Sequence, residues 1–354
     1  MERPPPLVVC LGFPVFHDES YLERLRGLDG VEPVVLPVDP EGDWGGVAPG
    51  EPHPEPPEWG RGVGPERRAA LARAEVLVAL HTPADLLALA PRLRWIQGIG
   101  AGIEQFAAAG VTRDRVIVTN GSGVSSGSMA EWVVGRLLQV WKRFRDADDA
   151  QRTHAFTRTY GRTFAGSTIG IVGLGSIGRA VAERVRALGC RVLGLRRSAR
   201  PGAQSEHADA LYAPEQLHEM LAACDAVVVA APATPETRHL IDARALAAMP
   251  RHAVLVNVAR GSLVDESAVA EALREGVIAA AVLDVFDPEP LAPESPLWDL
   301  PGVYVSAHSS VSVDRFMDDV FELVLDNLGR YLADEPLRNV VDMQALGFGA
   351  GAED

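Results

Sequence analysis

Short apolar runs alternate with stretches of helical periodicity along most of this chain. In the N-terminal third, the apolar runs predict strands over residues 7–12, 33–38, 75–80, 95–100 and 116–120. A second series predicts six strands, over residues 169–172, 191–195, 226–230, 254–258, 280–285 and 303–307. Such alternation is typical of βαβ units, so the pattern predicts an α/β protein with two doubly wound, mostly parallel sheets.

Two longer stretches, residues 128–144 and 313–332, have the 3.6-residue period of long helices. One face of the first carries Met129, Trp132, Val133, Leu137, Leu138 and Trp141. We expect this helix to bridge two lobes and the second helix to return the chain to the first lobe. The first lobe would then be discontinuous and flavodoxin-like, from residues 1–120 plus 311–354, and the second would span residues 121–310. Residues 42–64, rich in Gly, Pro and Glu, predict a surface loop.

The composition narrows the choice of partners and compartment. The 354 residues include 33 Lys plus Arg against 48 Asp plus Glu, a net charge of −15, which disfavours binding to nucleic acid or to an anionic membrane. Cys10, Cys190 and Cys224 lack metal-ligand spacing, as do the nine histidines, so we expect buried thiols, a reducing compartment and no metal site. Signal-peptide features and a membrane-spanning run are missing, and we expect a soluble cytoplasmic protein.

A glycine-rich motif predicts the chemistry of the second lobe. The sequence Gly173-Leu174-Gly175-Ser176-Ile177-Gly178 follows the predicted strand 169–172 and opens a helical stretch at 179–188. Glycines at this spacing permit a tight turn, a close approach of the backbone to a pyrophosphate, and close packing of helix on strand. With a further strand ending at residue 195, the motif predicts a Rossmann dinucleotide-binding domain rather than a plain glycine turn.

The end of that further strand bears on the cofactor. An NAD site usually has an acidic residue there for the ribose hydroxyls, whereas this chain has Arg196, Arg197 and Ser198, and its next acid is Glu206. Guanidinium groups bind a 2′-phosphate well. The cluster therefore predicts that NADP(H) is preferred and NAD(H) remains possible, although a solvated arginine cluster at a strand end is the alternative.

Three ionisable residues stand at or just after the ends of strands in the second series: Arg260, Glu289 and His308. Open α/β sheets place their ligand crevice at this edge, and His exchanges protons near neutral pH. Taken singly each is ambiguous, because a histidine at a strand end is more often a structural hydrogen-bonding residue and an arginine or glutamate is more often on the surface.

The sequence around these residues is more specific than the residues themselves. The chain resembles the D-isomer-specific 2-hydroxyacid dehydrogenase family over most of residues 75–342. The resemblance rests on Trp95-Ile96-Gln97-Gly98-Ile99-Gly100-Ala101-Gly102, Ala231-Pro232-Ala233-Thr234-Pro235-Glu236-Thr237, Asn257-Val258-Ala259-Arg260-Gly261, Leu283-Asp284-Val285-Phe286-Asp287-Pro288-Glu289-Pro290 and Ala307-His308-Ser309.

The resemblance implies a role for each group. Arg260 would bind the carboxylate and keto oxygen of the substrate, His308 would be the general acid/base, and Glu289 would orient His308 and stabilise its imidazolium. Asp284 would hold the nicotinamide carboxamide, and the backbone amides of Ala101 and Gly102 would receive the substrate carboxylate. Further cofactor contacts are implied for Ser176, Ile177, Ala231, Pro232, Thr237, Val258 and Ala259, and family members are usually homodimers joined through the dinucleotide domain.

These roles agree with the chemistry of keto-acid reduction. Negative charge develops on the carbonyl oxygen as hydride arrives, so a fixed cation and a proton donor are needed beside it. We therefore expect an NADPH-preferring reductase of small 2-keto acids such as glyoxylate or hydroxypyruvate. Two alternatives stay open: an enzyme of the same family for a larger aromatic or branched keto acid, and a dinucleotide-sensing, corepressor-like binding protein with marginal turnover.

Overall fold

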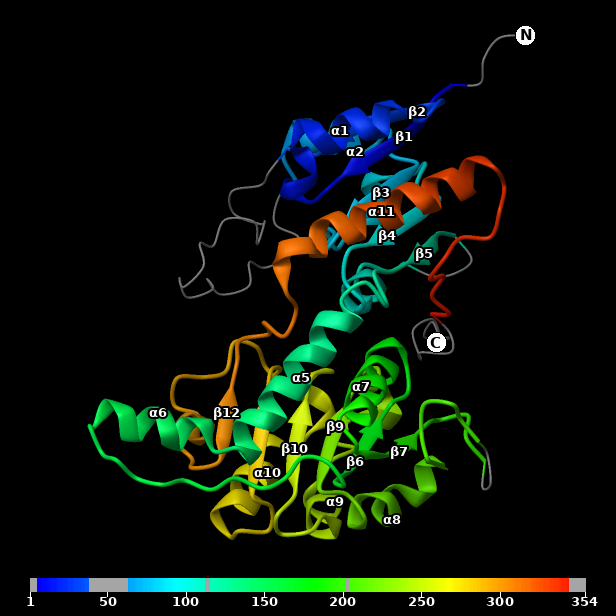
Figure 1. The fold of residues 1–354 in the computed structure, drawn as a ribbon. Helices are drawn as coiled ribbons and strands as arrows, with labels where there is room; N and C mark the ends of the chain where they lie inside the picture. Colours follow the sequence, from blue (N-terminus) through cyan, green and yellow to red (C-terminus); the bar gives the residue numbers. More distant parts are fainter. Residues whose placement is uncertain (1–4, 38–62, 112–114, 201–203, 344–354) are drawn as a thin grey trace. The chain divides into compact units, whose positions relative to one another are not determined.

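The structure is a computed structural model that describes residues 5–37, 63–111, 115–200 and 204–343 (Figure 1). Residues 42–62 of the predicted surface loop lie outside these ranges. The chain divides into two compact units, residues 1–124 with 313–354 (unit 1) and residues 125–312 (unit 2).

Unit 1 contains, among its described residues, a five-stranded parallel sheet in the order β2-β1-β3-β4-β5. This is the flavodoxin-like order, in which the chain reverses direction across the sheet beside its first strand. The strands are β1 (Leu7–Leu11), β2 (Val31–Val35), β3 (Val76–Ala79), β4 (Trp95–Gly98) and β5 (Ile117–Thr119), and the helices are α1 (Glu19–Arg26), α2 (Pro65–Leu71), α3 (Leu86–Leu89), α4 (Glu104–Ala108) and α11 (Val313–Leu332).

The two faces of this sheet are covered by different elements because successive strand residues point to opposite sides. Val8 and Cys10 belong to one core cluster, whereas Val9 and Leu11 belong to the other. The second cluster includes Phe321 and other apolar residues of α11, which lies along the sheet in Figure 1. Helix α11 therefore brings the C-terminal part of the chain back into the first unit, with the bounds predicted from the sequence.

A buried polar network fastens α11 to the sheet of unit 1. Asn327 donates to Gln97 Oε1 at 2.9 Å, and the Thr119 hydroxyl donates to the same oxygen at 2.8 Å. Asn327 Oδ1 accepts the backbone N–H of Arg338 at 2.7 Å. Because buried polar groups are costly unless they are hydrogen-bonded, this network fixes the register of the segment after α11, where Val341 donates its N–H to Val118 of β5.

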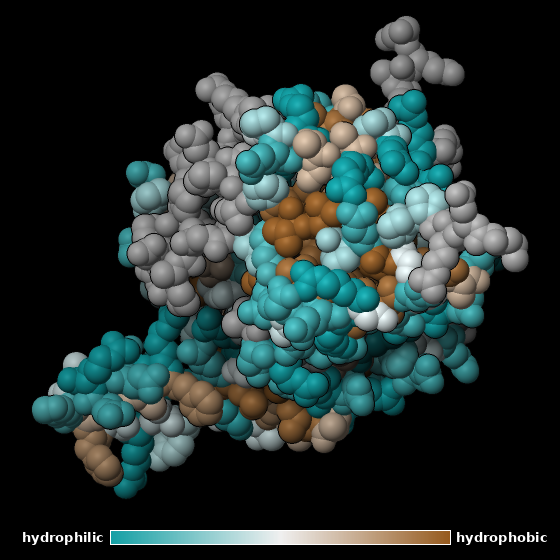
Figure 2. Space-filling model, turned by 90° about the horizontal axis from the view of Figure 1, so that it is seen from above, coloured by the Kyte–Doolittle hydropathy of each residue, from teal (hydrophilic) through white to brown (hydrophobic). Residues whose placement is uncertain are grey.

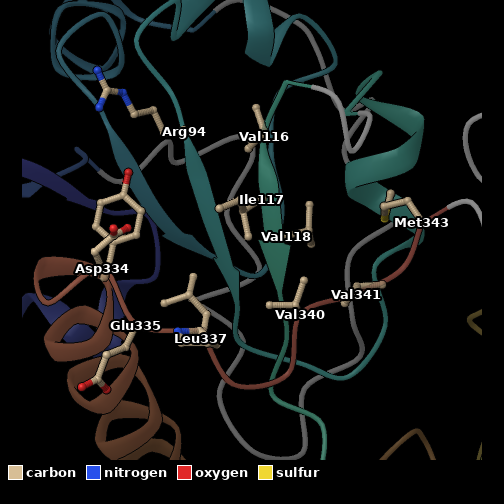
Figure 3. Close-up of a pocket in the computed structure, with 12 residues that line it drawn as sticks. Arg94, Val116, Ile117, Val118, Asp334, Glu335, Leu337, Val340, Val341 and Met343 are labelled. Carbon is tan, nitrogen blue, oxygen red and sulfur yellow. The ribbon is translucent and has the colours of Figure 1, made fainter.

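A pocket of about 560 Å³ lies in unit 1 beside the edge strand β5 (Figure 3). Apolar side chains from β5 and from the segment after α11 line one part of it, and Arg94, Asp334 and Glu335 line another. Its lining, as far as the described residues go, includes none of the residues predicted from the sequence to bind cofactor or substrate.

Unit 2 holds, within the residues the structure describes, a seven-stranded parallel sheet in the order β12-β11-β10-β9-β6-β7-β8. The chain thus runs outward on one side of β6 and then returns to run outward on the other, as in a Rossmann fold. The strands are β6 (Thr168–Val172), β7 (Arg191–Leu195), β8 (Ala210–Tyr212), β9 (Ala226–Val229), β10 (Val254–Asn257), β11 (Ala280–Leu283) and β12 (Val303–Val305). The helices are α5 (Ser126–Trp141), α6 (Phe144–Arg152), α7 (Ser176–Ala187), α8 (Leu217–Ala222), α9 (Ala243–Ala248) and α10 (Glu266–Arg274).

The prediction of two doubly wound parallel-sheet lobes is confirmed, with two corrections in unit 2. The second series has a strand that was not predicted, β8, which pairs with β7 at the edge of the sheet. The helix predicted over 128–144 is also wrong at its end, because α5 stops at Trp141 and Arg143 adopts a left-handed backbone with φ 56° before α6 begins.

The three cysteines are buried, as predicted. Burial raises the pKa of the Cys10 and Cys224 thiols to about 12 and that of Cys190 to about 11. Within the described ranges, helices long and apolar enough to cross a membrane are absent, and so are groups of three or more His, Cys, Asp or Glu side chains placed to hold a metal ion.

Candidate active site

The glycine motif forms the turn between β6 and α7. Gly173 has φ 100°, and a Cβ there would lie 2.7 Å from the Cα of Ala231, so a side chain would both strain the backbone and clash. Gly178 packs still more closely, since a Cβ there would lie 2.0 Å from the carbonyl oxygen of Gly173. A Cβ on Gly175 would meet nothing within 4 Å. The turn therefore leaves open space at Gly175, next to the first residue of α7, Ser176, with Ile177 half-buried behind it.

This geometry fits the pyrophosphate of a dinucleotide. Helix α7 has 12 residues, and its N-terminal N–H groups carry the partial positive charge that favours an anion. A backbone without a side chain at the approach point lets a phosphate reach those N–H groups.

The arginine cluster lies at the end of β7. Arg196, Arg197 and Ser198 are all exposed, and the Arg196 N–H donates to Tyr212 of β8. A hydrogen bond from Thr234 and the backbone N–H of Glu236 lower the pKa of the Glu236 carboxyl, and the charge of Arg197 lowers it further. The charge of Arg197, after β7, thus acts on a carboxyl in the loop that follows β9.

The loop after β9 contains three of the predicted cofactor residues. Thr237 donates its hydroxyl to the carbonyl oxygen of Pro232 at 2.8 Å and accepts the N–H of Thr234 at 2.8 Å. Ala231 contacts the glycine turn, as the close approach at Gly173 requires. The hydroxyl of Thr237 is therefore used to shape this loop, and the loop as a whole lies beside the glycine motif.

Arg260 follows the end of β10, and its backbone is held by a neighbouring amide side chain. The fully buried Asn257 donates to the carbonyl oxygen of Arg260 at 2.9 Å and accepts the N–H of Ala259 at 3.1 Å. Val258 and Ala259 between them are buried. The half-buried Arg260 guanidinium donates to the carbonyl of Ala259 at 2.8 Å. The turn after β10 is therefore rigid where Arg260 leaves it.

Asp284 follows the end of β11 and is fully buried. Its Oδ1 accepts the Ser306 hydroxyl at 2.7 Å and the Ser309 N–H at 2.9 Å, and its Oδ2 accepts the Ser310 N–H at 3.1 Å. Its backbone carbonyl accepts the N–H of His308 at 2.8 Å. The residue predicted to hold the nicotinamide thus also organises the segment that carries His308.

The side chains of His308 and Glu289 are in direct contact. His308 Nδ1 lies 3.0 Å from Glu289 Oε2, and the other oxygen of Glu289 accepts the N–H of Phe286 at 3.0 Å. His308 has φ 48°, a left-handed conformation that is uncommon outside glycine and that clusters at functional sites. Half of the His308 side chain is exposed.

The electrostatics tie Arg260 to this pair. Burial alone raises the pKa of the Glu289 carboxyl, but the hydrogen bond and charge of His308, the Phe286 N–H and the charge of Arg260 hold that pKa below its usual range. Glu289 is therefore ionised at neutral pH, and its carboxylate faces the His308 imidazole. The structure brings a guanidinium, an imidazole and a carboxylate into one interacting group at the carboxyl edge of the sheet.

The predicted substrate-carboxylate residues Ala101 and Gly102 belong to unit 1, just after β4. The carbonyl oxygen of Ala101 accepts the amide of Asn120 at 2.7 Å, and Gly121 donates its N–H to Gly100 at 2.8 Å. A Cβ on Gly121 would lie 2.0 Å from the carbonyl oxygen of Ile99. The loop is therefore held by the side chain of Asn120 and the backbone of Gly121.

Two residues that shape the site were not identified from the sequence, Asn257 and Ser306. Asn257 lies three residues before Arg260, in one of the motifs shared with the family. An amide side chain at the end of an apolar strand could have indicated this role, and the structure shows it to be fully buried. Ser306 carried no such signal, because its hydroxyl acts on Asp284, 22 residues earlier in the chain.

Comparison with known proteins identifies close relatives of this chain. A family model described as "D-isomer specific 2-hydroxyacid dehydrogenase, NAD binding domain" matches residues 134–310. A glyoxylate reductase from Aeropyrum pernix is 32% identical over 81% of this chain and 90% of that protein. The crystal structure of an NADPH-dependent glyoxylate/hydroxypyruvate reductase from Sinorhizobium meliloti, in complex with NADP and sulfate, superposes with a TM-score of 0.77 at 28% identity, over 98% of this chain and all of that one.

Other relatives are longer than this chain. The D-3-phosphoglycerate dehydrogenase of Mycobacterium leprae is 34% identical over 79% of this chain, but the match covers 54% of that protein. The chain thus spans about half the length of several curated relatives that it matches.

Substitution of Gly178 tests the dinucleotide site. Gly178→Ala should weaken NADP(H) binding at least tenfold, because the added methyl group displaces the turn from the carbonyl oxygen of Gly173. A tenfold loss of affinity corresponds to about 1.4 kcal/mol of binding free energy. The measurement is the dissociation constant from calorimetric titration. Gly135→Ala is the matched control, since Gly135 also lies in a helix and its Cβ would meet nothing within 4 Å. Equal affinities in the two variants would contradict a pyrophosphate site at this turn.

Proposed function

Because this chain belongs to the D-isomer-specific 2-hydroxyacid dehydrogenase family, we propose that it is an NADPH-preferring reductase of small 2-keto acids such as glyoxylate or hydroxypyruvate. The observation that carries the proposal is the contact of 3.0 Å between His308 Nδ1 and Glu289 Oε2 in a group that includes the charge of Arg260. Bound NADPH would supply the hydride that reduces the C2 carbonyl.

Arg260 and His308 divide the work at the carbonyl oxygen. The Arg260 guanidinium stabilises the negative charge that develops on this oxygen, because a fixed cation needs no reorganisation during the reaction. Since Nδ1 of His308 faces Glu289, Nε2 is the nitrogen that delivers the proton to the oxygen. In the oxidative direction the neutral imidazole takes the hydroxyl proton through the same nitrogen.

Glu289 keeps His308 ready for this step. Its ionised carboxylate stabilises the imidazolium and fixes the ring, so that Nε2 and not Nδ1 faces the substrate. Unit 2 is then the dinucleotide-binding domain and unit 1 the substrate domain, in which the backbone N–H groups of Ala101 and Gly102 receive the substrate carboxylate. Backbone N–H groups in a glycine-containing loop bind an anion without a bulky side chain.

The cofactor preference rests on the exposed guanidinium groups after β7. Arg196 and Arg197 are solvent-accessible and Ser198 adds a hydroxyl donor, a combination that suits a 2′-phosphate. The relative from Sinorhizobium meliloti is described as NADPH-dependent and was crystallised with NADP, which supports the same preference here.

A cofactor comparison tests the activity and the preference together. With glyoxylate or hydroxypyruvate, kcat/KM for NADPH should exceed that for NADH at least tenfold, and Arg196→Ala/Arg197→Ala should remove most of that ratio, because each tenfold corresponds to about 1.4 kcal/mol of phosphate binding. The measurement is the loss of absorbance at 340 nm. Arg191→Ala, at the opposite end of β7, is the matched control.

Two outcomes of this assay would contradict the proposal. Equal or better use of NADH would contradict the NADP(H) preference. Binding of NADPH without turnover of any keto acid in a panel that includes branched and aromatic members would favour a dinucleotide-sensing protein instead.

His308→Gln tests the acid–base assignment. The variant should lose a factor of about 10² to 10⁴ in kcat, as expected when general acid catalysis is removed, while its NADPH affinity changes little. His218→Gln is the control, because His218 is exposed on α8. Full activity of the His308 variant would require another proton donor.

We further propose that the protein is a homodimer joined through unit 2. Helix α6 has no buried side chain, and Phe144, Phe156 and Tyr160 are exposed to 51%, 101% and 78%. In Figure 1, α6 points away from the sheet of unit 2, and Figure 2 shows brown, hydrophobic atoms on the projecting segment. An isolated helix of nine residues is marginal in water, and exposed aromatic side chains on such a segment suit burial by a second copy.

The segment that projects from unit 2 is anchored to that unit near both of its ends, at Arg145 and Arg162. The part between these anchors is therefore the part that we assign to the dimer interface. Arg145 donates to the carbonyl of Val303 at 3.0 Å and stacks on Tyr304, and Arg162 pairs with Asp225 at 2.8 Å. Phe156 and Tyr160 lie between these two anchors, and Phe144 directly precedes the first.

Light scattering during gel filtration tests the dimer. The wild-type protein should elute with twice the chain mass of 37.8 kDa, and Phe156→Ser/Tyr160→Ser should shift the population toward monomer, because each removes an exposed aromatic group from the interface. Leu332→Ser, at an exposed apolar position at the end of α11, should leave the mass unchanged. A monomeric wild-type protein would overturn the proposal.

A further inference from the structure

Glu289 lies in a turn that begins at the end of β11, and residues from another segment of unit 2 hold this turn in place. A Cβ on Gly261 would lie 1.9 Å from the carbonyl carbon of Phe286 and 2.4 Å from the nitrogen of Asp287. The peptide between Phe286 and Asp287 therefore rests directly on the backbone of Gly261, the residue after Arg260. This contact sets how close the segment of Glu289 comes to the segment of Arg260.

The carboxylate of Glu266, which has no role in the proposed reaction so far, binds the same peptide. Glu266, the first residue of α10, accepts the N–H of Asp287 through Oε1 at 2.8 Å. The side chain of Asp287 in turn pairs with Arg238 at 3.1 Å. The peptide that rests on Gly261 is thus fixed by the hydrogen bond that its N–H donates to Glu266. Phe286, which supplies the carbonyl of this peptide, donates its own N–H to Glu289.

We propose that Glu266 is a positioning residue for Glu289: its carboxylate holds the Asp287 N–H, fixes the turn over Gly261 and so places Glu289 against His308. The inference rests on the proposed reductase function, because it assigns Glu266 to the acid–base pair of that reaction. Arg260 depends on a separate support, the buried amide of Asn257. Loss of Glu266 therefore acts on the proton-transfer pair and spares the substrate-binding cation.

The location of Glu266 is electrostatically unfavourable, which argues for a role beyond a helix start. Burial raises the pKa of the Glu266 carboxyl; the Asp287 N–H lowers it, and the charges of Asp287, Glu289 and Asp265 raise it again, for a net increase. An acid in the first turn of a helix is ordinarily favoured by the helix dipole. Here Asp265 already caps α10 by accepting the N–H of Ala268, so the cap does not need Glu266.

Two substitutions separate the acceptor oxygen from the charge. Glu266→Gln keeps an oxygen that accepts the Asp287 N–H, whereas Glu266→Ala keeps neither oxygen nor charge. Since misplacement of a catalytic group by about 1 Å costs up to about 10²-fold in rate, Glu266→Ala should lower kcat by about 10- to 100-fold. The KM for the keto acid and the affinity for NADPH should change little, and Glu266→Gln should retain most of the wild-type kcat. Glu271→Ala, at an exposed position of the same helix, is the matched control.

A readout without turnover separates this inference from the function on which it rests. The His308 imidazole resonances, assigned by their loss in His308→Gln, should move in Glu266→Ala toward their positions in Glu289→Gln and stay near wild type in Glu266→Gln. A wild-type protein that reduces no keto acid would defeat the proposed function, while these spectra would still decide whether Glu266 positions Glu289.

Three results would overturn the inference. The first is a Glu266→Ala variant with wild-type kcat and unmoved His308 resonances. The second is a Glu266→Gln variant as impaired as Glu266→Ala, which would assign the effect to charge. The third is a parallel loss of kcat, NADPH affinity and melting temperature in Glu266→Ala, which would assign Glu266 to the stability of α10 alone.

Discussion

The proposed chemistry depends first on the carboxylate of Asp284. A buried carboxylate is costly unless donors surround it, and here the donors come from the segment after β12, through Ser306, Ser309 and Ser310. That segment has to close over Asp284, and in doing so it places His308 in a left-handed backbone conformation. A carboxylate offers roughly four acceptor sites, so three donors leave capacity for one more. The role predicted for Asp284 at the nicotinamide is therefore compatible with its role in holding the loop.

The functional side chains are positioned mainly through backbone contacts at glycines. Gly178 brings α7 onto the turn at Gly173, and Gly261 brings the segment of Glu289 onto the segment of Arg260. In each case a missing Cβ lets two backbones approach to a distance that any side chain would prevent. Neighbouring polar groups such as Asn257 then fix the approach by hydrogen bonds to main-chain atoms. The geometry of the site is consequently a property of the packed turns, and the reacting side chains follow from it.

The sequence predicted those features that have a clear local pattern, and it failed where the pattern is weak, where it continues through a break, or where the contact is distant in the chain. Apolar runs located the strands of both sheets to within a few residues, because buried parallel strands are continuously apolar. The edge strand β8 was missed because it has three residues, all only half-buried, and thus no apolar run to detect. The helix break at Arg143 was missed because the 3.6-residue pattern continues through it. Glu266 was overlooked because an acid at a helix start has an ordinary local explanation, and its partner Asp287 is 21 residues away.

The distribution of charge shows how an acidic protein could bind the anionic substrate proposed for it. The net charge of −15 is spread over the chain, and exposed charges more than about 8 Å apart are largely screened at physiological ionic strength. Close to His308 the acids are already engaged, Glu289 by His308 and the Phe286 N–H, Asp287 by Arg238, and Glu266 by the Asp287 N–H. Each of these contacts is shorter than the screening length of about 8 Å. They therefore remain effective at physiological ionic strength, whereas the interactions with more distant exposed charges are weakened. In the proposed function, the guanidinium of Arg260 and the imidazole of His308 would thus meet an anionic substrate beside carboxylates that are already engaged.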